Sequence, residues 1–359
     1  MIFNNKFLQL KILYIFFLFL SLNLFFFSTN NSEAKAFQIE DIDISRPFLI
    51  NFDKNDVIDE GFKKAFSKLI SMLANSSDRK KINQTNLNEI KGMIESFSIK
   101  EEKFVNEIYY MNLGVSFNKK KIFNFFEKRN IFPSIPIKKV FLFIPIIIDE
   151  STKDLLIFSD NKVFENWNNS PKNFHLIDYI LPTEDLEDLN IIKSKFESIE
   201  KYDFKEIIDK YNLNDSIITL IFKNKNQLRI LSRITLQENI TLKNLTLSNI
   251  NMRNEEDIKS IIKTLKNEYE DYWKLTNQIN TSLKYPLKIK VQNIDNNKIS
   301  KFEEILINED LIYDFYISKF DKDFSYYNII FNGTPNLFIK SMNENNFNLN
   351  TQNKIWLLE

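Results

Sequence analysis

The sequence predicts an α+β protein of three small domains behind an N-terminal export signal. Stretches with the two-residue period of strands alternate with stretches of helical period along the 359 residues. A proline-containing linker at Ile131–Pro136 interrupts the periodic pattern, because each proline disfavours the helical region for the residue before it. The predicted parts are a signal peptide at 1–36, an α+β domain at 37–132, a layered α/β domain at 136–282 and a ferredoxin-like domain at 283–359.

The first 36 residues have the order of a secretory signal. Lys6 and Lys11 precede a largely apolar run, Ile12–Phe27, and a small-residue cleavage site follows at Ala34-Lys35-Ala36. The sixteen residues of the run rise about 24 Å as a helix, which is short of a ~30 Å hydrocarbon core. Cleavage after Ala36 is therefore expected, and the alternative is an uncleaved inner-membrane anchor formed by residues 12–27. Both place the rest of the chain in the periplasm.

The segment from Phe37 to Asn130 reads as helices around one clear strand. An apolar face with helical spacing predicts a first helix capped by Asp56 or Asp59 and broken by Asn75–Lys81. A second helix is expected from about Thr85, and its inward residues are Leu87, Ile90, Ile94 and Phe97. Alternation from Tyr109 to Phe117 predicts a half-buried strand, and a short helix carries Ile122, Phe123 and Phe126.

The middle segment mixes strands and helices. Val140–Ile148 reads as a buried strand with an edge or bulge at Pro145. The remaining expected strands are Leu155–Phe158, a stretch within Phe174–Leu181, Ile217–Phe222, Leu228–Leu236 and Leu242–Leu247. The expected helices are Leu189–Ile199, Phe204–Tyr211 and Ile258–Leu275.

The last segment spells βαββαβ, the order of the ferredoxin-like plan. Its expected elements are strand Leu287–Val291, helix Ser300–Ile307, strands Ile312–Phe320 and Tyr326–Phe331, helix Asn336–Asn345 and strand Ile355–Leu358. Asp321-Lys322-Asp323 forms the hairpin turn, and Gly333 supplies a positive φ if the entry to the second helix needs one.

Composition removes several classes of chemistry. The chain has no cysteine, one histidine and four scattered glycines, so thiol catalysis, His-rich metal sites, phosphate loops and GxGxxG turns are excluded. Its 48 basic and 48 acidic side chains show no basic stripe, which argues against a nucleic-acid partner. No cofactor is expected.

A lone histidine, an acidic run and two basic runs are the candidate polar sites, and a structural role is favoured for each. His175 has no neighbouring His or Cys, so it reads as an ordinary histidine. The acidic run Thr183–Asp188 lacks the spacing of a calcium loop, and it reads as a helix start that Thr183 caps. Lys119–Lys121 and Asp78–Lys81 read as solvated surface. No catalytic, cofactor-binding or metal-binding residue is assigned.

Four stretches carry a resemblance to a known family. They are Gly61–Leu69, Leu113–Asn118, Leu181–Asp188 and Ile208–Ile218. Together they resemble an uncharacterised family of exported bacterial proteins, domain of unknown function number two thousand and sixty-six, over about 37–275. The chain departs from it at Asn212, where a glycine is common, and at Thr183-Glu184, where the family is more apolar. Asn tolerates the left-handed conformation, so the first departure is mild. The resemblance implies an exported protein without naming an activity.

The expected function is that of a non-catalytic binding or assembly module that docks another envelope protein. Membrane contact is expected only through the N-terminal segment, if it is not cleaved. The alternatives are a hydrolase or glycan-processing enzyme with paired carboxylates, which needs neither Cys nor His, and a small-ligand carrier with an enclosed apolar cavity.

Overall fold

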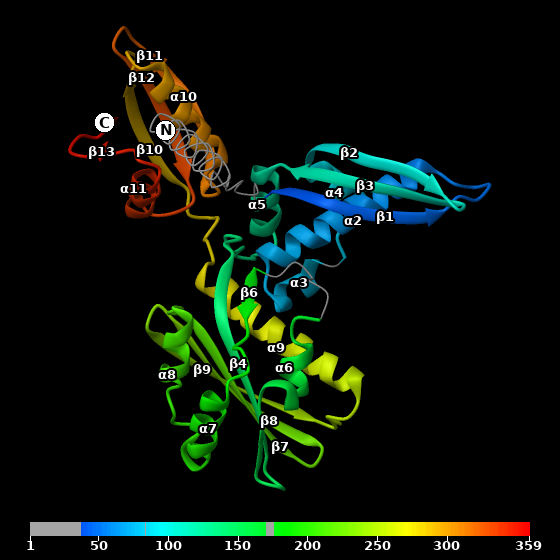
Figure 1. The fold of residues 1–359 in the computed structure, drawn as a ribbon. Coiled ribbons are helices and arrows are strands. Elements are labelled where there is room, and N and C mark those ends of the chain that lie inside the picture. The colour runs from blue at the N-terminus through cyan, green and yellow to red at the C-terminus, as the bar shows by residue number, and fades with distance from the viewer. Residues whose placement is uncertain (1–36, 83, 170–175) are drawn as a thin grey trace, which may run out of the picture. The chain divides into compact units, whose positions relative to one another are not determined.

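A computed structural model describes residues 37–82, 84–169 and 176–359. These residues form three β-sheets with helices packed on them, which confirms the α+β class (Figure 1). The predicted signal at 1–36 and His175 lie outside the described residues. Within the described part, no helix is long and apolar enough to cross a bilayer.

The N-terminal sheet has three antiparallel strands in the order β1-β3-β2. Helix α2 packs against β1 and β3 and contacts α4, so one face of the sheet is covered. The elements in chain order are β1 (Gln38–Pro47), α2 (Lys54–Leu73), α3 (Ser76–Ile82), α4 (Leu87–Met93), β2 (Ile94–Val105), β3 (Ile108–Phe117) and α5 (Lys119–Glu127). The core under α2 is built on Ile44, Phe66 and Leu113.

Of three predictions for this sheet, two are wrong. The helix expected from Thr85 to Phe97 ends at Met93, and Ile94 begins strand β2 instead. The predicted break after the first helix is confirmed, because α2 ends at Leu73 and Ala74 is extended. The Asn75 side chain then accepts a hydrogen bond from Asp78 N and starts a separate helix, α3. The cap of α2 is Asp53, which accepts from Asn55 N at 2.8 Å, so the helix begins earlier than expected.

The middle sheet has helices on both faces, as the layered α/β prediction requires. Strands run in the order β5-β4-β7-β8-β9, and β6 also pairs with β4. Residues of α6 and α9 join one core, and residues of α7 and α8 join the core on the other face (Figure 1). The elements are β4 (Lys139–Asp149), β5 (Asp154–Leu156), α6 (Lys162–Asn166), β6 (Ile177–Ile180), α7 (Leu186–Ser194), α8 (Lys205–Ile208), β7 (Ser216–Asn224), β8 (Gln227–Leu236), β9 (Asn239–Ser248) and α9 (Glu255–Thr276).

Pro145 lies at a local edge of strand β4, which is one of the two alternatives, edge or bulge, that the sequence predicted. Strand β4 pairs with β7 without interruption, while its other side pairs with β6 up to Leu142 and with β5 from Ile147 onward. The Asn161 side chain donates to Pro145 O at 3.0 Å on this second side. The backbone N and O of one residue point to the same side of a strand, so the Pro145 nitrogen also faces the side between β6 and β5. No strand lies there to pair with it among the described residues, so the missing N–H costs no hydrogen bond of the sheet.

A hydroxyl cluster ties α9 to the middle sheet. Tyr269 of α9 is fully buried, and its hydroxyl lies 2.7 Å from Thr219 Oγ1 of β7 and 2.8 Å from Ser232 Oγ of β8. Burial raises the pKa of Tyr269, so the group stays neutral and its proton is shared within the cluster.

The C-terminal sheet has the predicted elements and one departure in direction. Its elements are β10 (Tyr285–Gln292), α10 (Asn296–Asn308), β11 (Ile312–Phe320), β12 (Phe324–Phe331), α11 (Pro335–Glu344), β13 (Leu349–Asn350) and β14 (Trp356–Leu358). The strand order β11-β12-β10-β14-β13 places the hairpin and the last strand as the ferredoxin-like plan does. In that plan the strand after the second helix lies antiparallel to the first strand. Here an extra strand, β13, reverses the chain, so β14 runs parallel to β10 and the ferredoxin-like detail is not confirmed.

Gly333 has no positive φ, which corrects the conditional role suggested for it. A Cβ built there would lie 2.7 Å from Phe331 Cε1, so close approach of the buried Phe331 ring keeps this position small. The helix entry itself is as expected, because Thr334 caps α11 with Pro335 in its first turn.

Candidate functional site

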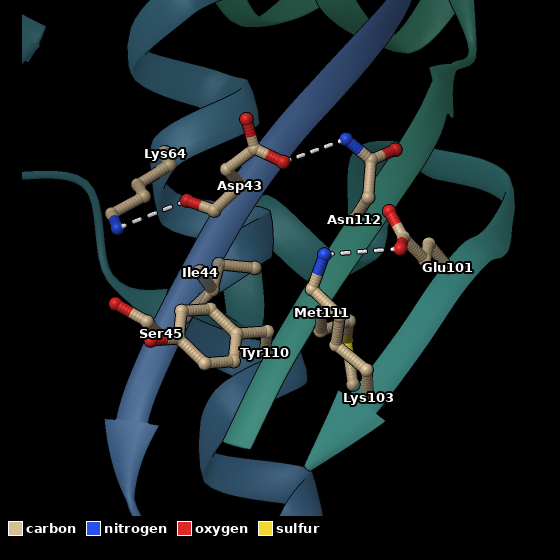
Figure 2. A pocket seen from close by; sticks show the side chains of 9 residues that line it. All are labelled: Asp43, Ile44, Ser45, Lys64, Glu101, Lys103, Tyr110, Met111 and Asn112. Atoms are coloured by element: carbon tan, nitrogen blue, oxygen red, sulfur yellow. Dashed lines mark hydrogen bonds and ion pairs between the residues drawn. The ribbon is translucent and has the colours of Figure 1, made fainter. Parts of the chain in front are cut away.

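The face of the N-terminal sheet opposite α2 is polar, and it holds a half-open hollow of about 360 Å³ (Figure 2). We name this surface the outer face. Two rows of side chains cross it because β3 pairs in register with both neighbours. Asp43 of β1 and Glu101 of β2 both lie opposite Asn112 of β3, and Ser45 and Lys103 both lie opposite Tyr110.

Hydrogen bonds hold the first row in place. Asn112 Nδ2 donates to Asp43 Oδ1 at 2.8 Å, and Lys103 Nζ lies 3.1 Å from Glu101 Oε1 (Figure 2). Asn112 Oδ1 is shielded from water and finds no hydrogen-bond partner within the described residues. The accessible groups beside it are the carboxylates of Asp43 and Glu101 and the phenol of Tyr110, which suit a ligand or partner group that donates hydrogen bonds.

An ion pair crosses the outer face above Gly114. Glu40 of β1 and Lys100 of β2 belong to strands on opposite sides of β3, yet their charged atoms lie 2.7 Å apart. A Cβ on Gly114 would lie 2.6 Å from Glu40 Oε2, so the contact depends on the absence of a side chain there. The Lys100 ammonium lowers the pKa of Glu40 below its usual value.

Large apolar side chains are exposed where these strands end. The loop after β1 contributes Phe48, Leu49 and Ile50, and the end of β2 contributes Phe104 and Val105. We name these five residues the apolar tip. Phe48 packs against Phe104 with ring centroids 4.9 Å apart, and Phe48 N donates to Glu107 O, so both loops form one surface. Ile50 is fully exposed and Leu49 is 63% exposed.

The acidic run at Thr183–Asp188 starts a helix, as predicted, but a different residue caps it. Asp185 accepts from Glu187 N at 2.8 Å and is the N-cap of α7, whereas Thr183 N donates to the Tyr211 hydroxyl. Lys210 lies 2.6 Å from the buried Asp188 carboxylate, and this contact raises the pKa of Lys210. Lys210 also lies 3.3 Å from Asp185 and 3.4 Å from Glu187, so it offsets part of the negative charge of the run.

The basic runs also serve the fold. Lys121 lies in the first turn of α5, and its ammonium donates to Gly92 O at 2.8 Å. Lys81 pairs with Asp78 one turn earlier in α3. Within the described residues, no three His, Cys, Asp or Glu side chains are grouped to hold a metal ion.

Buried charges in the middle sheet are bound to backbone. Glu270 accepts from Ile177 N at 2.8 Å, and burial raises the pKa of this carboxyl. Lys266 donates to Trp167 O at 2.7 Å and lies over the Trp167 ring, and burial lowers the pKa of Lys266. These contacts hold α9 against the segment around β6.

The outer face and the apolar tip were not found from sequence, because strand β1 was not predicted. Its inward residues Ile39, Ile42 and Ile44 lose the two-residue period at a bulge, where Asp41 has φ 57°. The run Phe48-Leu49-Ile50 next to Asn51 was the available signal, since consecutive apolar residues in a surface loop are unusual unless they serve a function.

No protein-family model matches the chain, and a search of curated proteins finds no match. The resemblance to the exported bacterial family therefore stays a prediction. Asn212 adopts the left-handed conformation with φ 50° and ψ 34°, which asparagine tolerates.

Proposed function

We propose that the chain is an exported protein of the bacterial cell envelope that acts as a non-catalytic binding module. It docks another envelope protein through the apolar tip and the adjoining outer face of the N-terminal sheet. The observation that carries the proposal is the apolar tip, where five large apolar residues lie together and remain in contact with solvent. Contiguous apolar surface of this kind marks interaction sites on soluble domains.

The surroundings of the apolar tip support a protein partner. Arg46 pairs with Glu60 and Lys54 pairs with Glu102, so the rim is charged but locally neutral. An apolar centre within a polar rim is the usual anatomy of a protein–protein interface. Aromatic anchors such as Phe48 and Phe104 contribute most of the binding energy in such interfaces.

The outer face fits recognition better than carboxylate catalysis. Asp43 and Glu101 lie on either side of Asn112, but the Glu101 side chain is 63% exposed in a half-open hollow. A carboxylic acid that donates a proton at neutral pH needs an apolar, enclosed setting to raise its pKa. Polar groups on an open face instead give orientation and specificity to a docked partner.

The test is capture of the partner from native envelopes with a tagged chain and cross-linking. The variant Leu49→Ser/Ile50→Ser removes exposed apolar surface without touching the core, and Leu186→Ser, 77% exposed on α7, is the matched control. We expect one envelope protein in stoichiometric amount with the wild type and the control, and at least ~10-fold less with the double variant.

Equal capture by all three chains would contradict docking at the apolar tip. Sequencing the N-terminus of the recovered chain tests export in the same experiment. Phe37 as the first residue supports cleavage after Ala36, and Met1 in a membrane-bound chain supports the anchor.

A further inference from the structure

The edges of the three sheets differ in how they are protected against pairing with another strand. Natural edge strands are usually short, bulged, charged or covered, because their free N–H and C=O groups recruit other strands. Strand β1 has a bulge, and Lys64 and Lys68 of α2 donate to its carbonyls at Asp43 and Glu40. Strands β2 and β11 each have two register shifts, and β5, β6 and β13 have at most four residues.

Within the described residues, a single lysine is the one protection of this kind on strand β9. It runs for ten residues, Asn239–Ser248, and pairs with β8 in unbroken register. It contains neither proline nor glycine, and Lys243 is its one charged residue. The Lys243 ammonium lies 3.3 Å from Glu268 Oε1, so this charge is drawn toward α9 and away from the free edge.

The two faces of β9 differ in a way that favours a strand partner. Leu245 and Leu247 are half-buried in the core that includes α9. On the opposite face, Ile240 and Leu242 are 62% and 58% exposed, and neither belongs to the core formed with α7 and α8. A strand added at this edge would cover both aliphatic side chains with its own residues.

We propose that β9 pairs antiparallel with β9 of a second copy of this chain, joining two middle sheets across a two-fold axis. A two-fold axis normal to the sheet keeps the Ile240 and Leu242 faces of both copies on one side, so the aliphatic groups of one copy supply the cover that the other lacks. Both strands are already formed by pairing with β8, so association orders little additional backbone.

The charge on Lys243 restricts the register. Residues opposite each other in an antiparallel pair must point to the same face of the sheet. The two-fold axis therefore lies between one residue and the same residue of the second copy. An axis at Lys243 would set two ammonium groups opposite each other, which is unfavourable. An axis at Leu242 sets the two leucines opposite each other, and an axis at Asn244 sets Leu242 opposite Thr246 and Lys243 opposite Leu245. Both avoid the repulsion, and of the axes that do so these two keep both Ile240 and Leu242 within a paired stretch of at least seven residues.

The experiment uses the cysteine-free sequence as its background. Single variants Leu242→Cys and Asn244→Cys place one thiol at each allowed axis, where opposed Cα atoms at about 4.5–5.5 Å match disulfide geometry. Leu186→Cys and Tyr316→Cys are exposed controls on α7 and β11. Under mild oxidation of the full chain, we expect a product of twice the 42.9 kDa chain mass from one of the β9 variants. It should form roughly 100-fold faster than from the controls, because paired thiols react at millimolar effective concentration.

A second measurement does not depend on cysteine chemistry. Sedimentation of the wild-type chain at micromolar concentration is expected to give a dimer, and Leu242→Lys is expected to give a monomer. Ile307→Lys, which changes an equally exposed residue of α10, should leave the dimer intact.

A monomeric wild type, or cross-linking of both β9 variants no faster than the controls, overturns the proposal. A stable complex at β9 with a different protein, formed without a disulfide, overturns it as well. That outcome would mean that β9 pairs with a strand of another protein. The apolar tip takes no part in these readouts, so docking at the tip and pairing at β9 stand or fall separately.

Discussion

Gly61 is a position where a single added methyl group would collide with core side chains. A Cβ there would lie 2.7 Å from Leu113 Cδ2 and 2.8 Å from Ile44 Cδ1, both in the core beneath α2. Overpacking of this kind costs about 1–3 kcal/mol, while alanine gains about 1 kcal/mol of helix propensity over glycine. We expect Gly61→Ala to lower the free energy of unfolding by up to about 2 kcal/mol in urea titrations.

Gly92 is the matched control for this substitution. It lies in α4, and a Cβ there meets nothing within 4 Å. Gly92→Ala should raise the free energy of unfolding by about 0.5–1 kcal/mol. A loss of stability in Gly92→Ala as large as in Gly61→Ala would contradict the steric explanation.

Asp149 makes the free energy of unfolding depend on pH in the acidic range. Lys223 Nζ lies 2.6 Å from Asp149 Oδ2, and this contact, aided by a hydrogen bond from Ser151 N, lowers the pKa of the carboxyl. The folded state therefore binds fewer protons than the unfolded state near this pKa. The stabilisation is complete above the unfolded pKa of about 3.9 and disappears as pH falls through the lower, folded pKa.

The expected result is a urea midpoint that falls as pH drops from about 5 toward 2. Asp149→Asn should be less stable at neutral pH and should show a shallower fall over the same range. The Asp203→Asn variant, at an exposed position, provides the reference slope. Equal slopes in wild type and Asp149→Asn would show that this carboxyl does not carry the acid sensitivity.

Two hairpins turn on residues that are poorly suited to their backbone. Asn106 and Glu107 join β2 to β3, Gln237 and Glu238 join β8 to β9, and all four have φ between 48° and 69°. Two consecutive residues at positive φ define a type I′ turn, which prefers Asn-Gly. Glutamate in the left-handed region costs about 1–2 kcal/mol. Glycine removes this cost, but it also raises the conformational entropy of the unfolded chain, which offsets part of the gain in stability.

Glu107→Gly and Glu238→Gly should each raise the free energy of unfolding by about 0.5–1 kcal/mol. Thermal or urea denaturation measures the change. Lys263→Gly, at an exposed position inside α9, should instead lower it by about 1 kcal/mol. If all three variants lose stability alike, the turn conformation is not the cause.

Elements with uninterrupted periods were predicted correctly from sequence. Strand β4 alternates between the two cores of the middle sheet, so its continuous apolar run reads as a strand buried on both faces. Strands β1 and β2 were missed because bulges shift their inward residues out of alternation. The extra strand β13 has two residues, too few for a periodic signal, and it reverses the direction of β14.

The outer face could not be predicted because tertiary pairing assembles it. Asp43 and Asn112 are 69 residues apart in the chain, and register alone sets them side by side with Glu101. The edge strand β9 was easier to predict from the sequence than the outer face. Its strand was predicted in part, at Leu242–Leu247, but the absence of a neighbour beyond it is a property of the sheet order.

The buried hydroxyls of Tyr269, Thr219 and Ser232 limit how α9 can lie on the middle sheet. Apolar contacts tolerate a helix that slides by one turn, since one aliphatic group replaces another. Hydroxyls without partners in a dry core cost about 1–3 kcal/mol each. A shifted helix would bury the Tyr269 hydroxyl without its two partners, and it would leave Thr219 and Ser232 only their long contact of 3.4 Å with each other. The cluster therefore favours one placement of α9 over shifted placements that bury a similar apolar area. This placement also sets the position of Glu268 beside β9.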